Sequence, residues 1–194
     1  IFTMKLYRDC NGIGLPTSSQ ILNVWNHPSV TQITLFFISN NDISPSCNST
    51  NSGYQALDCT TNPNGAVQEY IYSSMPITLI GIPPISNPPT PNSHGWHFTW
   101  SSCCRNASII NLANPSSDGF TLRASMFAFV DHLGNSTPND PCFDSSPTFL
   151  ESPKTIMCAA SPFTFTQNAY DSEMDSLVYN WDQPLDNNFS GLFN

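Results

Sequence analysis

The chain has 194 residues, a length that suits one large domain or one domain and part of a second. Only 10% of the residues are charged, the net charge is -9, and the few basic residues are scattered. Nucleic-acid binding is therefore not expected, because no basic stripe could neutralise phosphates. Membrane insertion is not expected either, since no apolar run approaches the roughly 20 residues of a spanning helix.

A series of short segments rich in β-branched and aromatic residues predicts strands along the whole chain. Turn-forming clusters of Asn, Gly and Asp separate them, and no segment keeps a helical period of apolar residues. The sequence therefore predicts an all-β protein, an antiparallel β-sandwich of the Ig-like type stapled by disulfides. Strands are expected at residues 2–8, 21–25, 31–38, 67–72, 95–100, 108–112, 120–130, 163–166 and 177–181.

Proline and composition predict the domain organisation. The Pro-rich segment 82–92 cannot pair as a central strand, because proline lacks the N–H that a ladder needs. We predict a surface loop inserted between strands, with an exposed recognition loop as the alternative. Residues 1–146 are expected to form the sandwich. Residues 147–194 are expected to be a connector and the beginning of a second Ig-like or PKD-like domain, or else a piece that completes the first.

The cysteines predict the compartment. A cytosolic chain seldom carries seven, and none of these stands in a CxxC pattern that would indicate a zinc site. An oxidising compartment with structural disulfides is the remaining interpretation, so we expect an extracellular or cell-surface protein. The chain also begins inside a predicted strand, without a signal peptide, and we expect it to be part of something longer.

Two disulfide pairs are expected from the spacing of the cysteines, although connectivity cannot be derived from sequence. Cys47 and Cys59 flank a polar loop and are expected to close it. Cys142 and Cys158 flank the predicted domain boundary and are expected to staple it.

A third bridge is expected between Cys10 and one of the adjacent cysteines, Cys103 or Cys104. Neighbouring residues on a strand point to opposite faces. One of the two, with Cys104 preferred, is therefore expected to bridge, while the other stays a buried thiol. A reactive thiol beside Arg105 is the alternative.

The aromatic residues of segment 95–100 suggest two roles. Trp96, Phe98 and Trp100 share one face of a strand, and His97 lies on the other. We predict a row of aromatic residues facing the core and an exposed histidine. The alternative is a glycan-binding platform formed by Trp96 and Trp100.

Several phrases, in order along the chain, resemble motifs of large secreted surface proteins of the Bacteroidetes. They are Leu6-Tyr-Arg-Asp-Cys-Asn-Gly12, Trp100-Ser-Ser-Cys-Cys-Arg-Asn106, Pro162-Phe-Thr-Phe165 and the block from Ala169 to Tyr179. The resemblance implies a long, repeat-bearing protein exported by type IX secretion and associated with gliding motility or adhesion.

An acidic loop is the candidate metal site. Asp171, Glu173 and Asp175 alternate, and oxygen ligands at this spacing can converge on Ca²⁺. The resemblance supports calcium, although the family's loop usually has Asp and Gly where this chain has Glu173 and Met174. The alternative is an acidic cluster that is simply solvated.

Candidate modification sites are also present. Asp175-Ser176-Leu177 resembles the short O-glycosylation motif of Bacteroidetes, with Ser176 as the acceptor. Four N-x-Ser/Thr sequons would serve as glycan sites in a eukaryotic secreted protein. They begin at Asn48, Asn106, Asn135 and Asn188.

No motif of a catalytic site is present, so an enzyme is not expected. We expect a structural or adhesive module of a bacterial surface protein, and a glycan-binding module is the alternative. The expected partners are other domains of the same long chain, surface polysaccharide or other cell-surface proteins.

Overall fold

The computed structural model describes residues 1–44, 56–84, 95–106, 109–128, 145–150, 164, 166, 168–181 and 185. Within these residues the protein is all-β, as predicted, and contains no helix long and apolar enough to cross a membrane. The strands are β1 (Thr3–Asp9), β2 (Gln20–Trp25), β3 (Gln32–Asp42), β4 (Val67–Ser74), β5 (Trp96–Ser102), β6 (Phe120–Met126), β7 (Thr148–Phe149) and β8 (Ala169–Tyr170).

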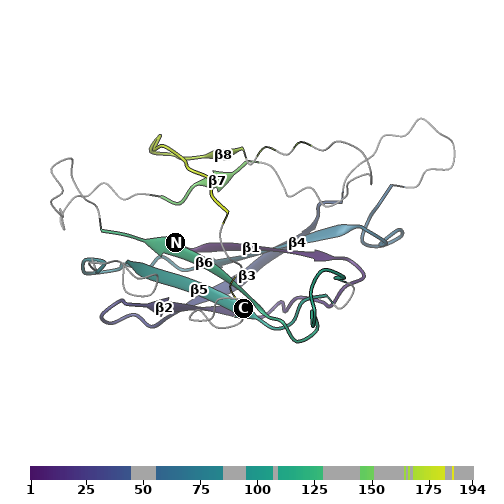
Figure 1. Ribbon diagram of the computed structural model, residues 1–194, viewed down its shortest axis with the longest axis horizontal. Helices are drawn as coiled ribbons and strands as arrows, with labels where there is room; N and C mark the ends of the chain where they lie inside the picture. The colour runs from purple at the N-terminus through teal and green to yellow at the C-terminus, as the bar shows by residue number, and fades with distance from the viewer. Residues whose placement is uncertain are drawn as a thin grey trace.

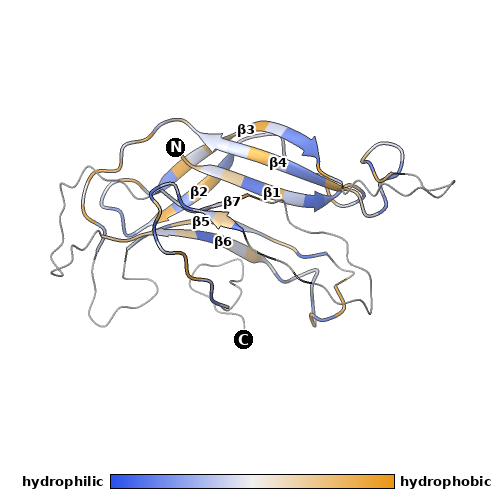
Figure 2. Cartoon of the chain, turned by 90° about the horizontal axis from the view of Figure 1, so that it is seen from above, coloured by the Kyte–Doolittle hydropathy of each residue, from blue (hydrophilic) through white to orange (hydrophobic). Residues whose placement is uncertain are grey.

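Six strands form one antiparallel sheet in the order β1-β4-β3-β2-β5-β6. The sheet is curled, so that its two ends approach each other across the core. The rings of Phe2, next to β1, and Phe98 in β5 lie 4.6 Å apart, although three strands separate β1 from β5 in the sheet. Figure 2 shows β3, β4 and β1 on one side and β5 and β6 on the other, an arrangement that resembles a sandwich.

The core follows from the alternation of apolar side chains along the strands. In β1 and in the first half of β3, every second residue is buried, because successive side chains point to opposite faces. In β5 the residues of both faces are buried. The buried cluster consists of Met4, Leu6, Leu22, Val24, Ile33, Leu35, Tyr70, Tyr72, Trp96, Phe98 and Trp100.

Two of the predicted strands are wrong in the described residues. Residues 109–112 form a turn, in which Ile109 N–H donates to the carbonyl of Asn106 and Ile110 is fully exposed. Residues 177–181 form no strand and pair with no described strand. Both segments have β-branched or aromatic residues, but neither has a described neighbour against which to bury them.

The C-terminal part lies partly against the main sheet. Strands β7 and β8 form a separate two-stranded sheet, which Figure 1 shows above the six-stranded one. Further on, the carbonyl of Leu185 accepts a hydrogen bond from Thr121 N–H in β6. Leu185 thus bonds to the first sheet, while the predicted second domain stays a prediction.

Candidate functional site

The first disulfide joins Cys10 to Cys59, which corrects the expected pairings of Cys59 with Cys47 and of Cys10 with Cys103 or Cys104. Strands β1 and β4 are antiparallel, and Cys10 N–H donates to the carbonyl of Ala66 just before β4. The turn at residues 59–61 precedes Ala66 and brings Cys59 to the end of β1. Strand register therefore decides the pairing, and sequence spacing does not.

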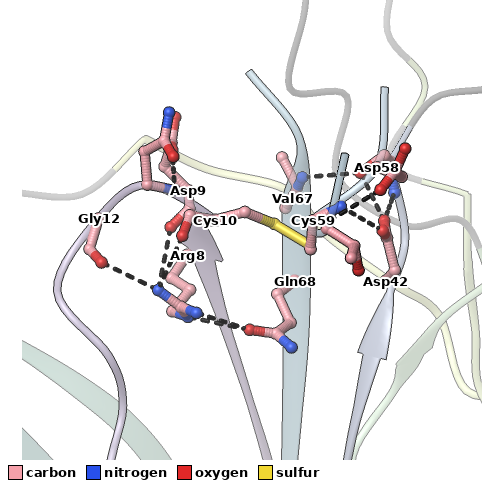
Figure 3. The surroundings of a disulfide bond; sticks show 12 residues. Arg8, Asp9, Cys10, Gly12, Asp42, Asp58, Cys59, Val67 and Gln68 are labelled. Atoms are coloured by element: carbon pink, nitrogen blue, oxygen red, sulfur yellow. Dashed lines mark hydrogen bonds between the residues drawn. A yellow bond between two sulfur atoms is a disulfide. The ribbon is translucent and has the colours of Figure 1, made fainter. Parts of the chain in front are cut away.

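Two carboxylates accept backbone hydrogen bonds on the Cys59 side of this bond (Figure 3). Asp42, at the end of β3, accepts the N–H groups of Cys59 at 2.7 Å and Ser44 at 2.9 Å. Asp58 accepts the N–H groups of Thr60 and Thr61, so its side chain closes the turn. Burial and the nearby charge of Asp58 act to raise the pKa of Asp42, but the hydrogen bonds prevail and lower it.

Arg8 holds the opposite side of the same cluster. Its guanidinium donates to Gln68 Oε1 at 2.8 and 3.0 Å and to the carbonyl of Gly12 at 2.9 Å (Figure 3). It also lies over the ring of Tyr70. These contacts bind the exit of β1 to β4, and we call the arrangement around Cys10–Cys59 the disulfide clamp.

A second disulfide joins the neighbouring residues Cys103 and Cys104. The expectation that one bridges to Cys10 while the other stays a buried thiol is therefore wrong. Both residues follow the last residue of β5 and are exposed, so the alternation rule for strands does not apply to them. The predicted partners Cys47, Cys142 and Cys158 lie outside the described residues.

The aromatic row of β5 faces the core, as predicted. Trp96 is 2% exposed and Trp100 is 6% exposed. Trp100 Nε1 donates to Gln20 Oε1 at 3.1 Å, and the ring of Trp96 lies against His27 at 4.5 Å. This burial contradicts the alternative glycan platform at Trp96 and Trp100, because a sugar cannot stack on rings that the core covers.

The opposite face of β5 differs from expectation. His97 is 2% exposed, and its Nδ1 lies 2.8 Å from Ser125 Oγ in β6. Thr99 is also buried, and its hydroxyl accepts the Nε1–H of Trp25. The expectation of an exposed histidine is wrong, because the ring of Phe127 lies against His97 and the indole of Trp25 bonds to Thr99 on this face.

The acidic loop closes on itself rather than around a common centre. Asp171 is 6% exposed, and its Oδ1 accepts the N–H groups of Glu173 and Asp175. Glu173 turns outward, and its carboxylate accepts the N–H and the hydroxyl of Ser145. Among the described residues no three acidic, histidine or cysteine side chains come together to hold a metal. The calcium site at Asp171, Glu173 and Asp175 stays a prediction.

Met174 takes a left-handed backbone conformation at the turn of the acidic loop. Its φ is 64°, in the left-handed region where glycine is favoured. The loop thus makes with a methionine a turn for which glycine is usually needed. Met174 is 86% exposed, so the turn carries a large apolar side chain into solvent.

The candidate modification sites divide into two groups. Ser176 and Asn106 are both exposed and therefore accessible to a modifying enzyme. Asn48, Asn135 and Asn188 lie outside the described residues.

A polar cluster on the outer face of β1 and β4 was not predicted from the sequence. The carboxylate of Glu69 is 3.3 Å from Lys5 Nζ and accepts the hydroxyl of Tyr7 at 3.1 Å. Burial, the hydrogen bond to Glu69 and the glutamate charge together raise the pKa of Tyr7 to about 12. The alternation of Lys5 and Tyr7 placed them on one face, but the register that brings Glu69 opposite Tyr7 comes from the structure.

Comparison with known proteins adds no relative. No protein-family model, no curated protein and no solved structure matches the chain. The two disulfides nonetheless indicate a protein that matures outside the reducing cytoplasm.

Proposed function

We propose that this chain is a structural and adhesive module, without catalytic activity, of a large secreted bacterial surface protein. The observation that carries the proposal is the disulfide clamp on a curled antiparallel sheet, which makes a rigid unit with little charge. The resemblance to secreted Bacteroidetes proteins favours the cell surface, type IX export and a role in adhesion or gliding.

The polar side chains of the clamp support a passive role. Asp42 and Asp58 hold turns, and Arg8 holds the end of a strand. These residue types could act in acid–base chemistry, but here each one is engaged in holding local structure. A spacer that transmits force needs such fixed joints.

The outer face of the sheet supports weak contact with other molecules. Ile21 in β2 and Phe36 and Ile38 in β3 are 41%, 48% and 59% exposed. Scattered apolar side chains of this kind bind weakly one at a time. Many copies along a surface would add their effects through effective concentration, which suits an adhesin whose partners are surface polysaccharide or other cell-surface proteins.

A bead assay tests the proposal. Beads coated with increasing densities of the oxidised chain are flowed over a lawn of Bacteroidetes cells, with albumin-coated beads as the control. We expect attachment to rise steeply with coating density, while the soluble chain competes poorly. Density-independent attachment, strong competition by the soluble chain, or no attachment contradicts the proposal. High-affinity capture of one soluble glycan would instead favour the alternative function, a glycan-binding module.

A further inference from the structure

The two disulfides of the described chain have different relations to the fold. Cys10 and Cys59 are separated by 49 residues and are half-buried, so their bond fixes distant parts of the sheet. Cys103 and Cys104 are neighbours, so their bond closes only a small ring through one peptide. A crosslink stabilises mainly by closing a long loop in the unfolded chain, and this one closes none.

The bond between Cys103 and Cys104 is also placed where small molecules reach it. Both residues are exposed, in contrast to the half-buried Cys10 and Cys59. They lie directly after β5, at the start of the connection to β6. Thiol–disulfide exchange requires access of the attacking sulfur to one disulfide sulfur, and exposure provides it.

The chain on both sides of this ring is held by contacts that do not involve sulfur. Before it, Ser102 at the end of β5 pairs with Phe120 in β6. After it, Arg105 N–H is shared between the carbonyls of Pro115 and Asp118, at 2.9 and 3.0 Å. Opening the disulfide therefore leaves the ends of the segment in place.

Arg105 adds a favourable charge beside the ring. Its Nε donates to the carbonyl of Gly119 at 3.0 Å, and its guanidinium lies over the ring of Phe120. A cation close to a disulfide stabilises the thiolate that leaves when the bond is attacked, and Arg105 is the basic residue that directly follows the pair in sequence. Only five residues of this chain are basic and its net charge is -9, so few positions have a basic residue as a sequence neighbour.

From these observations we propose that Cys103–Cys104 is a thiol-exchange site that reacts with small thiols at the surface of the protein. The proposal goes beyond the adhesive function and does not depend on it. A thiolate attacks one sulfur and forms a mixed disulfide, and the electron pair of the broken S–S bond goes to the other cysteine, which then takes up a proton. A second small thiolate then attacks the small-molecule sulfur of the mixed disulfide, which forms the small disulfide and releases the cysteine as a thiol. Two small thiols thus give one small disulfide and the reduced Cys103–Cys104 pair, with transfer of two electrons and two protons.

The adjacent thiol makes the intermediate short-lived. As soon as a mixed disulfide forms at one cysteine, the other lies within one residue and can expel the small thiol again. Intramolecular attack of this kind is fast, because the two groups need not find each other. Mixed disulfide should therefore accumulate only when one of the two cysteines is removed.

The test is a redox titration of the oxidised chain in buffers of increasing reduced-to-oxidised dithiothreitol ratio. Each sample is quenched with acid, alkylated with N-ethylmaleimide and digested with chymotrypsin. Cleavage after Trp100 and Leu112 isolates the vicinal pair, while cleavage after Tyr7 and Leu57 places Cys10 and Cys59 on other peptides. Near-UV circular dichroism follows the fold in parallel.

We expect Cys103–Cys104 to be half-reduced at a ratio at least about tenfold lower than Cys10–Cys59, with the circular dichroism spectrum unchanged at that point. Coincident midpoints, or a vicinal pair that opens only after the clamp, would overturn the proposal. So would loss of the fold when only the vicinal pair is open.

A variant makes the exchange step itself visible. After incubation with the disulfide of 2-mercaptoethanol, Cys104→Ser should carry one adduct at Cys103, detected by mass on the chymotryptic peptide that ends at Leu112. The oxidised parent chain incubated with 2-mercaptoethanol should carry less than about a tenth as much adduct at this pair, because the second cysteine expels it. Equal adduct on the two proteins contradicts the proposal, as does an unreactive Cys103 in a variant whose circular dichroism is native.

Discussion

Removing the disulfide clamp should lower the free energy of unfolding by about 4 kcal/mol. The perturbation is the double change Cys10→Ser and Cys59→Ser. The bond closes a loop with a sequence separation of 49 residues, and the chain-entropy relation for that length gives about 4 kcal/mol at 25 °C. Native contacts change little, because both backbone N–H groups keep their acceptors, Ala66 O at 3.0 Å and Asp42 Oδ2 at 2.7 Å.

The assay is equilibrium denaturation in guanidinium chloride, followed by tryptophan fluorescence and far-UV circular dichroism. Because the loss acts through the unfolded chain, the dependence of the unfolding free energy on denaturant should also steepen, as the unlinked chain exposes more surface. For a chain of this size the thermal midpoint should fall by about 8–16 °C.

The matched control is the double change Cys103→Ser and Cys104→Ser. It removes the same number of sulfur atoms but opens no long loop, so the free energy of unfolding should change by less than about 1 kcal/mol. Equal losses in the two variants would refute the reasoning, since loop length would then be irrelevant. A loss below about 1 kcal/mol in the clamp variant would refute it as well.

Four further predictions concern the core, the outer face and the loops. Trp100→Ala should lower the free energy of unfolding, measured by chemical denaturation, by about 3–5 kcal/mol. Trp25→Ala should lower it clearly less, because Trp25 is half-exposed and only the Trp100 change empties a buried site. Equal losses would contradict the assigned core. Because folding raises the pKa of Tyr7 from 10.0 to about 12, the folded state holds the proton more tightly, so stability should be complete below pH 10 and decline as the pH rises to 12. Tyr7→Phe should flatten this decline in thermal melts, and an unchanged slope would contradict the shift. Gly95→Ala should destabilise by about 1–3 kcal/mol, because φ is +83° and a Cβ would lie 2.8 Å from a backbone carbonyl oxygen; an unchanged denaturation midpoint would count against that conformation. A chelator should leave the melting midpoint unchanged, because Asp171 Oδ1 already accepts two backbone N–H groups and the carboxylate of Glu173 binds Ser145; a fall of several degrees would support the calcium hypothesis.

Alternation of apolar residues was enough to predict much of the sheet. Every second residue of Thr3–Asp9 is apolar up to Leu6, and the same holds at Gln32–Leu35, so a half-buried strand is the simple interpretation. The aromatic row of Trp96–Ser102 was predicted to face the core for the same reason. The burial of His97 was not, because it depends on Ser125 and on neighbouring strands that periodicity does not place.

The cysteine pairs show where sequence reasoning ends. Spacing favoured Cys47 with Cys59, since a short polar loop is easily closed. The observed partner, Cys10, is distant in sequence but is brought to Cys59 by the antiparallel register of β1 and β4. Long-range register is decided by the whole set of cross-strand contacts, and no local pattern contains it.

The adjacent cysteines required a different kind of reasoning. The strand rule would hold only if Cys103 and Cys104 lay within β5, which ends at Ser102. Beyond the strand, the two side chains can meet. A bond between them closes no long loop in the unfolded chain, so it contributes almost nothing to the free energy of unfolding. An exposed bond with so little effect on the fold can open without consequence for the sheet. On this reasoning the Cys10–Cys59 clamp contributes to stability, the vicinal pair contributes reactivity, and the two variants above measure each contribution separately.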